Sequence, residues 1–229
     1  MELTERHHAC IAALYYSELE DREIENRRDI FVFATRMYGE GRGRRMALRA
    51  MRDGQPLSFS SYKRYGEWRN TETVKKEMGG NISEEKGFAP DYVTEIFVCP
   101  WAKQFADMGM KECGSVYCSE IDRSIVRGFS PFLKFETLQS LNERDRCIQV
   151  MYDAHFIKGE IPMGDDRYRR DFSYHCAHIY YTFRNTIVSV LGKTGEEIAD
   201  SVKERFIGLY GEELFKMIRV YENEDFEVI

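Results

Sequence analysis

The chain has 229 residues, a formal net charge of −6 and 43% hydrophobic residues. That hydrophobic content is enough for a folded core and excludes disorder as the default interpretation, and the acidic balance argues against nucleic acid as the main partner. No apolar run approaches the roughly 20 residues that cross a bilayer, and the first residues lack the apolar segment of a signal peptide. We therefore expect a cytoplasmic protein without nucleic-acid or membrane partners.

The chain contains six cysteines. In a reducing compartment they are expected to be thiols rather than disulfides. They include no Cys-x-x-Cys pair, which disfavours a zinc ribbon. We expect no cofactor and no bound metal.

The N-terminal part is predicted to be helical. Residues 4–22 form the first predicted helix, because apolar residues recur at helical spacing after Thr4, which is a plausible N-cap. A second, longer helix is predicted over 26–52, where the glycines of 39–43 favour a break. Residues 54–90 are punctuated by Gly, Pro, Ser and Asn and predict an ordered connector with short helices.

The character of the sequence changes after this connector. Residues 92–99 are rich in β-branched and aromatic side chains and predict a strand. Pro100 suits the first turn of a helix that follows the strand. Another helix is predicted over 113–127, ended by Gly128.

Two further strands are predicted over 133–141 and 146–152, around a polar turn that is typical of a hairpin. After a loop at 159–171, helical patterning returns from 172 to about 221. We expect a single domain over 1–229, with a helical N-terminal part, a sheet-and-helix core and a helical C-terminal part (1–90, 91–153 and 154–229).

The helix over 113–127 carries the first candidate site. Cys118, Ile121, Asp122 and Ile125 share one of its faces, so a carboxylate lies on the side that should be buried. A buried carboxylate is costly unless it is paired, hydrogen-bonded or neutralised. Either Cys118 and Asp122 face a polar pocket, or Cys118 packs and Asp122 bridges to an arginine. The residues favour neither alternative.

Two more cysteines are candidates for the same pocket. Cys99 lies at the end of a strand, just before the predicted helix that Pro100 and Trp101 open, and a helix N-terminus lowers the pKa of a thiol. A buried structural cysteine is the commoner alternative. Cys147 lies in the middle of a strand, where it either points toward that pocket or packs.

Histidines are few and clustered. His7 and His8 flank the apolar stripe of the first helix. His175 and His178 are three residues apart, a spacing that can supply two metal ligands. Because no third ligand is evident nearby, a solvated helix face is the favoured interpretation.

Arginines at helical spacing form a stripe on the second helix: Arg42, Arg45, Arg49 and Arg52, with Arg44 beside it. A solvated face is the favoured interpretation. The functional alternative is capture of a carboxylate by a forked guanidinium group.

Several motifs follow one another along the chain. Cys99-Pro100, Cys118-x-x-x-Asp122, the Gly128 turn and a strand pair closing with Cys147 lie in the central part. Arg6-His7-His8-Ala9, Gly43-Arg44-Arg45-Met46-Ala47-Leu48-Arg49 and Tyr65-Gly66-Glu67-Trp68 precede them. In this order they resemble the L-2-amino-thiazoline-4-carboxylic acid hydrolase family, and the resemblance covers nearly the whole chain.

The central part also resembles, more distantly, 4-vinyl reductase-type small-molecule-binding domains, which pack an antiparallel sheet against helices. Some of those domains bind zinc through Glu-x-x-Cys-x7-Cys. This chain matches that pattern at Glu136 and Cys147 but has Gln139 in place of the middle cysteine. A metalloprotein that uses Cys113, Cys118, Glu136 or Cys147 is an alternative.

The resemblance implies an α+β fold in which a central antiparallel sheet packs against helices, with helical N- and C-terminal segments. It also implies a hydrolase that acts on C–N or C–S bonds of a small, non-peptide heterocycle. The reaction would convert 2-aminothiazoline-4-carboxylate to N-carbamoyl-cysteine, with a small-molecule substrate as partner.

Roles follow from the resemblance for the candidate residues. Asp122 would be the base or the amidine partner, and Cys118 the nucleophile or a pocket wall. An arginine of the 44–49 stretch, Arg45, would hold the carboxylate with His7 or His8. The remaining substrate-binding candidates are Trp68, Cys99 and Cys147. The alternative function is a non-catalytic small-molecule-binding or sensing module, and a homo-oligomer is expected.

Overall fold

The computed structural model describes residues 2–229. Its helices are α1 (Glu5–Asp21), α2 (Arg27–Arg52), α3 (Phe59–Arg64), α4 (Glu72–Met78), α5 (Pro100–Asp107), α6 (Lys111–Phe129), α7 (Phe172–Leu191), α8 (Lys193–Tyr210) and α9 (Glu212–Arg219), with a short 3-10 turn, η1 (Asp166–Tyr168). Its strands are β1 (Ile82–Gly87), β2 (Tyr92–Val98), β3 (Phe135–Gln139) and β4 (Cys147–Met151). The α+β fold is confirmed.

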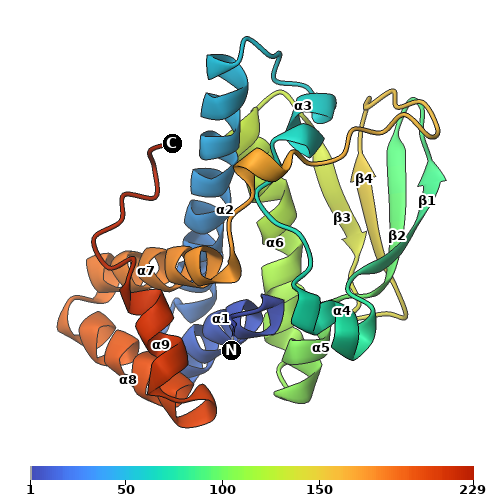
Figure 1. Ribbon diagram of the computed structural model, residues 1–229. Helices are drawn as coiled ribbons and strands as arrows, with labels where there is room; N and C mark the ends of the chain where they lie inside the picture. Colours follow the sequence, from blue (N-terminus) through green and yellow to red (C-terminus); the bar gives the residue numbers. More distant parts are fainter. Residues whose placement is uncertain (1) are drawn as a thin grey trace.

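The strands form one antiparallel sheet in the order β1-β2-β4-β3. Figure 1 shows this sheet at one side of the molecule, with α6 between the sheet and α2. The C-terminal helices α7, α8 and α9 lie on the far side of α2. The layers thus run from the sheet through α6 and α2 to the C-terminal helices.

The first helix begins where the sequence predicts. Thr4 is the N-cap of α1, and its backbone N–H donates to Nδ1 of His7 at 3.0 Å. His7 is at position N3 of the helix. A side chain at N3 that accepts from the N-cap backbone N–H satisfies a donor that the helix leaves without a partner. Burial, reinforced by the charge of Arg6, lowers the pKa of His7 to about 4, so the ring is neutral at pH 7 and can accept this bond.

The long helix α2 is continuous, so the predicted break at its glycines is wrong. Gly39 and Gly43 instead allow α2 to approach α6. A Cβ on Gly39 would lie 2.7 Å from Cβ of Ser124, and one on Gly43 would overlap the carbonyl oxygen of Ile125. Gly128 of α6 likewise meets the backbone of Glu40, and α6 ends one residue later, at Phe129.

The strand at 92–99 and the hairpin of β3 and β4 are confirmed, each with ends shifted by up to two residues. β1 was not predicted and lies in the connector that was expected to hold only short helices. Its residues are almost all exposed, and its sequence therefore shows no alternation of apolar and polar side chains by which a strand could be predicted. The C-terminal helical patterning is confirmed by α7, α8 and α9.

Strand register determines which sheet residues face α6. Ile96 pairs with Cys147, and Thr94 and Thr137 both pair with Gln149. Because paired residues in an antiparallel sheet share a face, this register places Cys147, Gln149 and Thr137 together on the inner face of the sheet. None of the helices formed by residues 2–229 combines the length and the apolar character that a membrane span requires.

Candidate active site

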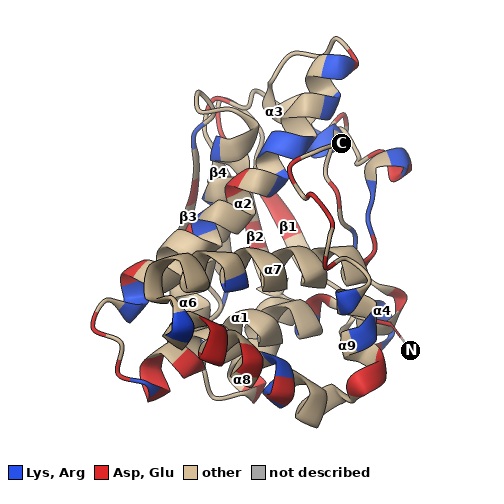
Figure 2. Cartoon of the chain, turned by 90° about the vertical axis from the view of Figure 1, so that its left-hand side faces the viewer, with Lys and Arg blue, Asp and Glu red and all other residues tan. Residues whose placement is uncertain are grey.

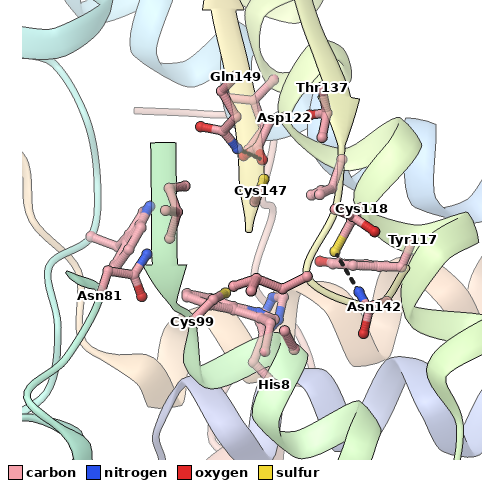
Figure 3. A pocket seen from close by; sticks show the side chains of 18 of the residues that line it. His8, Asn81, Cys99, Tyr117, Cys118, Asp122, Thr137, Asn142, Cys147 and Gln149 are labelled. Carbon is pink, nitrogen blue, oxygen red and sulfur yellow. Dashed lines mark hydrogen bonds between the residues drawn. The ribbon is translucent and has the colours of Figure 1, made fainter. Parts of the chain in front are cut away.

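A cavity of about 140 Å³ lies between α6 and the inner face of the sheet. Figure 3 shows side chains from the helices, the strands and the turn before β4 pointing into it. The structure brings six of the predicted site residues together in its lining: His8, Trp68, Cys99, Cys118, Asp122 and Cys147. His7 and Arg45 are not part of the lining.

α6 contributes the face that the helical spacing predicts, because Cys118, Ile121, Asp122 and Ile125 all line the cavity. The opposite face of α6 is not wholly exposed. Glu120 is buried and is ion-paired there with Arg36 at 2.7 Å and with Arg123.

Asp122 has a neutral hydrogen-bond partner. Nε2 of Gln149 on β4 donates to Oδ2 of Asp122 at 2.8 Å. Burial raises the pKa of Asp122, against the opposing effects of the Arg42 charge and the Gln149 hydrogen bond. A carboxylate with a raised pKa is a stronger base than an exposed aspartate, which suits it to take a proton from water.

The three thiols in the lining are neutral at pH 7. Burial raises the pKa of Cys99 to about 11 and that of Cys147 to about 12. It also raises the pKa of Cys118 well above its usual value, and Nδ2 of Asn142 donates to this sulfur at 3.4 Å. Of the two alternatives that the sequence leaves at Cys99, a thiol with a lowered pKa is not supported, because the helix N–H groups that lower its pKa are outweighed by burial.

Hydrogen bonds determine which nitrogen of His8 carries the proton. The indole N–H of Trp101 donates to Nδ1 of His8 at 3.0 Å, so that nitrogen accepts. The proton is then on Nε2, which lies 2.8 Å from the hydroxyl of Tyr38 and donates to it. Burial lowers the pKa of His8 well below its usual value, so the ring stays neutral. The hydroxyl proton of Tyr38 therefore remains available to a ligand.

Four buried polar atoms of the lining have no hydrogen-bond partner within residues 2–229: Nε of Arg42, Oδ1 of Asn81, the hydroxyl of Tyr117 and Oδ1 of Asn142. Buried polar groups are nearly always hydrogen-bonded, and an unpartnered one is costly. A ligand that offers both acceptors and donors would satisfy them.

The family model described as L-2-amino-thiazoline-4-carboxylic acid hydrolase matches residues 4–149. The chain belongs to this family. All residues that line the cavity, from His8 to Gln149, lie within the matched segment. No curated protein and no solved structure shows a significant match to the chain.

The arginine stripe of this family member is largely buried, so its interpretation as a solvated face is wrong. Arg45 is fully buried, and its guanidinium is bound to Glu67 at 2.8 Å. Arg49 contacts the same carboxylate at 2.6 Å. Arg42 is 3.7 Å from it and is the arginine that reaches the cavity. Arg52 remains exposed.

His175 and His178 are buried, so their interpretation as a solvated helix face is also wrong. Nε2 of His175 lies 3.2 Å from the carbonyl oxygen of Glu67. Over residues 2–229, His, Cys, Asp and Glu side chains do not gather in groups of three or more that could hold a metal. Of the four candidates of the metalloprotein alternative, Cys118 and Cys147 line the cavity, whereas Cys113 lies in the core and Glu136 accepts from the hydroxyl of Tyr152.

Sequence reasoning missed part of the lining. Tyr38, Asn81, Tyr117 and Asn142 carry no local pattern, and only the fold shows that their polar atoms face a common space. Arg42 did carry a signal, because it belongs to the arginine stripe. The choice of Arg45 within that stripe depended on a motif rather than on the helix face that meets α6.

Proposed function

We propose that the protein is a hydrolase that opens 2-aminothiazoline-4-carboxylate to N-carbamoyl-cysteine in the cavity between α6 and the sheet. The observation that carries this proposal is the pair of charges in the lining. Asp122 is a carboxylate with a neutral hydrogen-bond partner, and Arg42 is a buried guanidinium that reaches the cavity, with its Nε 3.7 Å from Glu67 and without a hydrogen bond. The substrate has complementary groups, an amidine-like centre and a carboxylate.

The other polar atoms fit the same substrate. Arg42 is proposed to bind the carboxylate, since a guanidinium can make paired hydrogen bonds with it. The amide oxygens of Asn81 and Asn142 are acceptors for the exocyclic amino group. The neutral thiols of Cys99, Cys118 and Cys147 form a polarisable wall for the ring sulfur.

In the proposed reaction Asp122 acts as a general base. It takes a proton from water while the oxygen bonds to the carbon between nitrogen and sulfur, and the positive charge of the protonated amidine is discharged. The C–S bond then breaks, and the protonated Asp122 returns its proton to the leaving sulfur. The added hydroxyl loses its proton to solvent and becomes the carbonyl oxygen of the carbamoyl group.

We assign Cys118 to the pocket wall rather than to nucleophilic attack. A thiolate is the reactive form of cysteine, and the raised pKa of Cys118 keeps the thiol protonated. Its hydrogen-bond contact is the donor amide of Asn142, which cannot remove the thiol proton.

The test is a mass-spectrometric ring-opening assay with 2-aminothiazoline-4-carboxylate. Asp122→Asn keeps the shape of the side chain but removes the base, and kcat/KM should fall about 10²- to 10⁴-fold. Asp200→Asn, at an exposed carboxylate on α8, is the matched control and should have no effect. Absence of turnover by the wild type, or full activity of Asp122→Asn, would refute the proposal.

The same assay distinguishes the two roles of Cys118. Cys118→Ala should retain measurable turnover if the thiol is a wall, and should lose it if the thiol is a nucleophile. Cys113→Ala on the same helix removes a thiol that packs in the core and controls for the loss of a buried side chain.

A second candidate function is a non-catalytic small-molecule-binding module. It is favoured because the thiols and His8 are neutral. It is also favoured because Asp122 is the single carboxylate among the lining residues. If the wild type shows no turnover but binds the heterocycle, and Asp122→Asn still binds it, this candidate replaces the hydrolase.

A further inference from the structure

A second chamber, of about 290 Å³, adjoins the cavity. The two spaces share Arg42, Trp68, Asp122 and Ile125 in their linings. Arg42 and Asp122 thus lie at the boundary between them. The second chamber is completed by residues of α2 and α3, Gly66 and the loop around η1: Met46, Tyr62, Lys63, Gly66, Gly164 and Arg169.

Lys63 is the unusual residue of this chamber. It lies in the last turn of α3, is half-buried, and its Nζ is 4.7 Å from the centre of the Tyr92 ring. Within residues 2–229 it makes no side-chain hydrogen bond and has no carboxylate within 4.0 Å, whereas most lysines and arginines of this chain are ion-paired. A half-buried cation that forms no ion pair loses hydration, and burial lowers the pKa of Lys63 although the charge of Glu85 acts in the opposite direction.

Arg169 shows the contrast. Its guanidinium donates to Oδ1 of Asp166 at 2.6 Å and to the carbonyl oxygens of Trp68 at 2.7 Å and Gly164 at 3.1 Å. These bonds tie the loop to the connector and leave the group little capacity for a ligand. Lys63 and Arg42 are therefore the two cations of the chamber that make no side-chain hydrogen bond within residues 2–229; the side chain of Arg42 is 9% exposed, and its Nε lies 3.7 Å from the carboxylate of Glu67.

We propose that the second chamber is an anion-binding subsite, which takes the carboxylate of the ligand between Lys63 and Arg42 while the heterocycle occupies the cavity beside Asp122. The identity of the ligand rests on the proposed function, but the anion site does not. Lys63 would thus select heterocycles that carry a carboxylate. Since it contacts a group that does not react, it affects ground state and transition state alike, so its loss should raise KM and leave kcat unchanged.

The test is calorimetric binding of 2-aminothiazole-4-carboxylate, whose aromatic ring resists opening, and of 2-aminothiazole, which lacks the carboxylate. Lys63→Gln should weaken binding of the carboxylate compound about fivefold and leave 2-aminothiazole unaffected. Lys63→Arg should preserve most of the affinity. Lys134→Gln is the matched control, because Lys134 also lies over a tyrosine ring, at 4.1 Å from Tyr152, but is exposed and far along the chain from α3.

Equal affinity of Lys63→Gln and wild type for the carboxylate compound would overturn the subsite. Equal weakening of both compounds would overturn it as well, because that result indicates a structural role for Lys63. Wild-type protein that binds both compounds equally, or neither, has the same consequence. Carboxylate-selective binding without any turnover of 2-aminothiazoline-4-carboxylate would instead refute the hydrolase and leave the subsite standing.

Discussion

Asp122 shows how two neighbouring side chains set the basicity of a buried carboxyl group. Burial raises its pKa, while the charge of Arg42 and the hydrogen bond from Gln149 lower it. A hydrogen bond to the charged form of a carboxyl group favours that form. Gln149 therefore keeps Asp122 ionised at a lower pH than burial alone would allow.

Replacing Gln149 by leucine should move the acid limb of the activity profile. Without the donor the pKa of Asp122 rises further, so the base is protonated over a wider acidic range and kcat/KM falls at a higher pH than in the wild type. The measurement is kcat/KM for ring opening as a function of pH. Gln139→Leu is the control, since Gln139 on β3 donates to the carbonyl oxygen of Arg146 instead. An unshifted acid limb in Gln149→Leu would show that Asp122 is not the titrating base.

What the sequence predicts at this scale depends on how local the cause is. The α6 face with Cys118 and Asp122 could be predicted because helical spacing alone decides which residues share a face. The pKa of Cys99 could not, because the local helix effect is outweighed by burial among residues distant in sequence. The unpartnered atoms of Tyr117 and Asn142 are likewise visible only once the chain is folded.

At the scale of elements, the contact between α2 and α6 holds the face of α2 that carries Arg42 and the face of α6 that carries Asp122 at the cavity. Gly43 and Gly128 make this contact close, because a Cβ at either position would overlap the backbone of the other helix. Overpacking of such a contact is destabilising. Replacing a glycine in an exposed part of a helix by alanine has the opposite effect and is stabilising, since alanine is the better helix former there.

Gly43→Ala should therefore lower the free energy of unfolding by about 1–3 kcal/mol. The matched variant is Gly208→Ala on α8, where the added Cβ meets no atom within 4 Å, and it should stabilise the protein by up to about 1 kcal/mol. Urea unfolding at pH 7 measures both. Two changes of the same sign would contradict the assignment of Gly43 to helix packing.

The same contact explains where element prediction fails. The glycines of 39–43 favour a break by propensity, but tertiary packing uses them as contact points within a continuous helix. β1 was missed because it is an exposed edge strand with the polar sequence Ile-Ser-Glu-Glu-Lys-Gly. The central strands β2 and β4 and the amphipathic helices have clearer sequence patterns, and their positions were predicted to within about two residues.

At the scale of the whole molecule, the buried cluster of Glu67 with Arg42, Arg45 and Arg49 joins the family-matched segment to the C-terminal segment. The guanidinium of Arg45 also donates to the carbonyl oxygen of Phe226, whose ring stacks on His178 of α7 at 4.7 Å. Glu227 pairs with Arg44, and Figure 2 shows the C-terminal end beside basic residues of α2. The cavity residue Arg42 is thus held by contacts that extend across the fold.

Glu67→Gln should be strongly destabilising, because it leaves three buried guanidinium groups without their shared anion. Burial raises the pKa of Glu67, but the charges of Arg45 and Arg42 and the hydrogen bonds from Arg45 outweigh it and lower the pKa from 4.5 to about 2. Loss of one partner from a buried ion pair costs about 3–5 kcal/mol, and urea unfolding at pH 7 should report a loss of that size. Glu72→Gln, at an exposed pair with Lys75, should change stability by less than about 0.5 kcal/mol.

The pH dependence of this loss identifies its origin. A carboxyl group with a lowered pKa stabilises the folded state fully above its unfolded pKa, and that contribution is lost as pH falls toward the folded value. Wild-type stability should therefore decline between about pH 4.5 and pH 2 as Glu67 takes up its proton, and the curve of Glu67→Gln should be flatter over the same range. If the two curves stay parallel, the destabilisation comes from packing of the amide rather than from the missing charge. The anchoring of Arg42 would then depend on shape and not on the ion cluster.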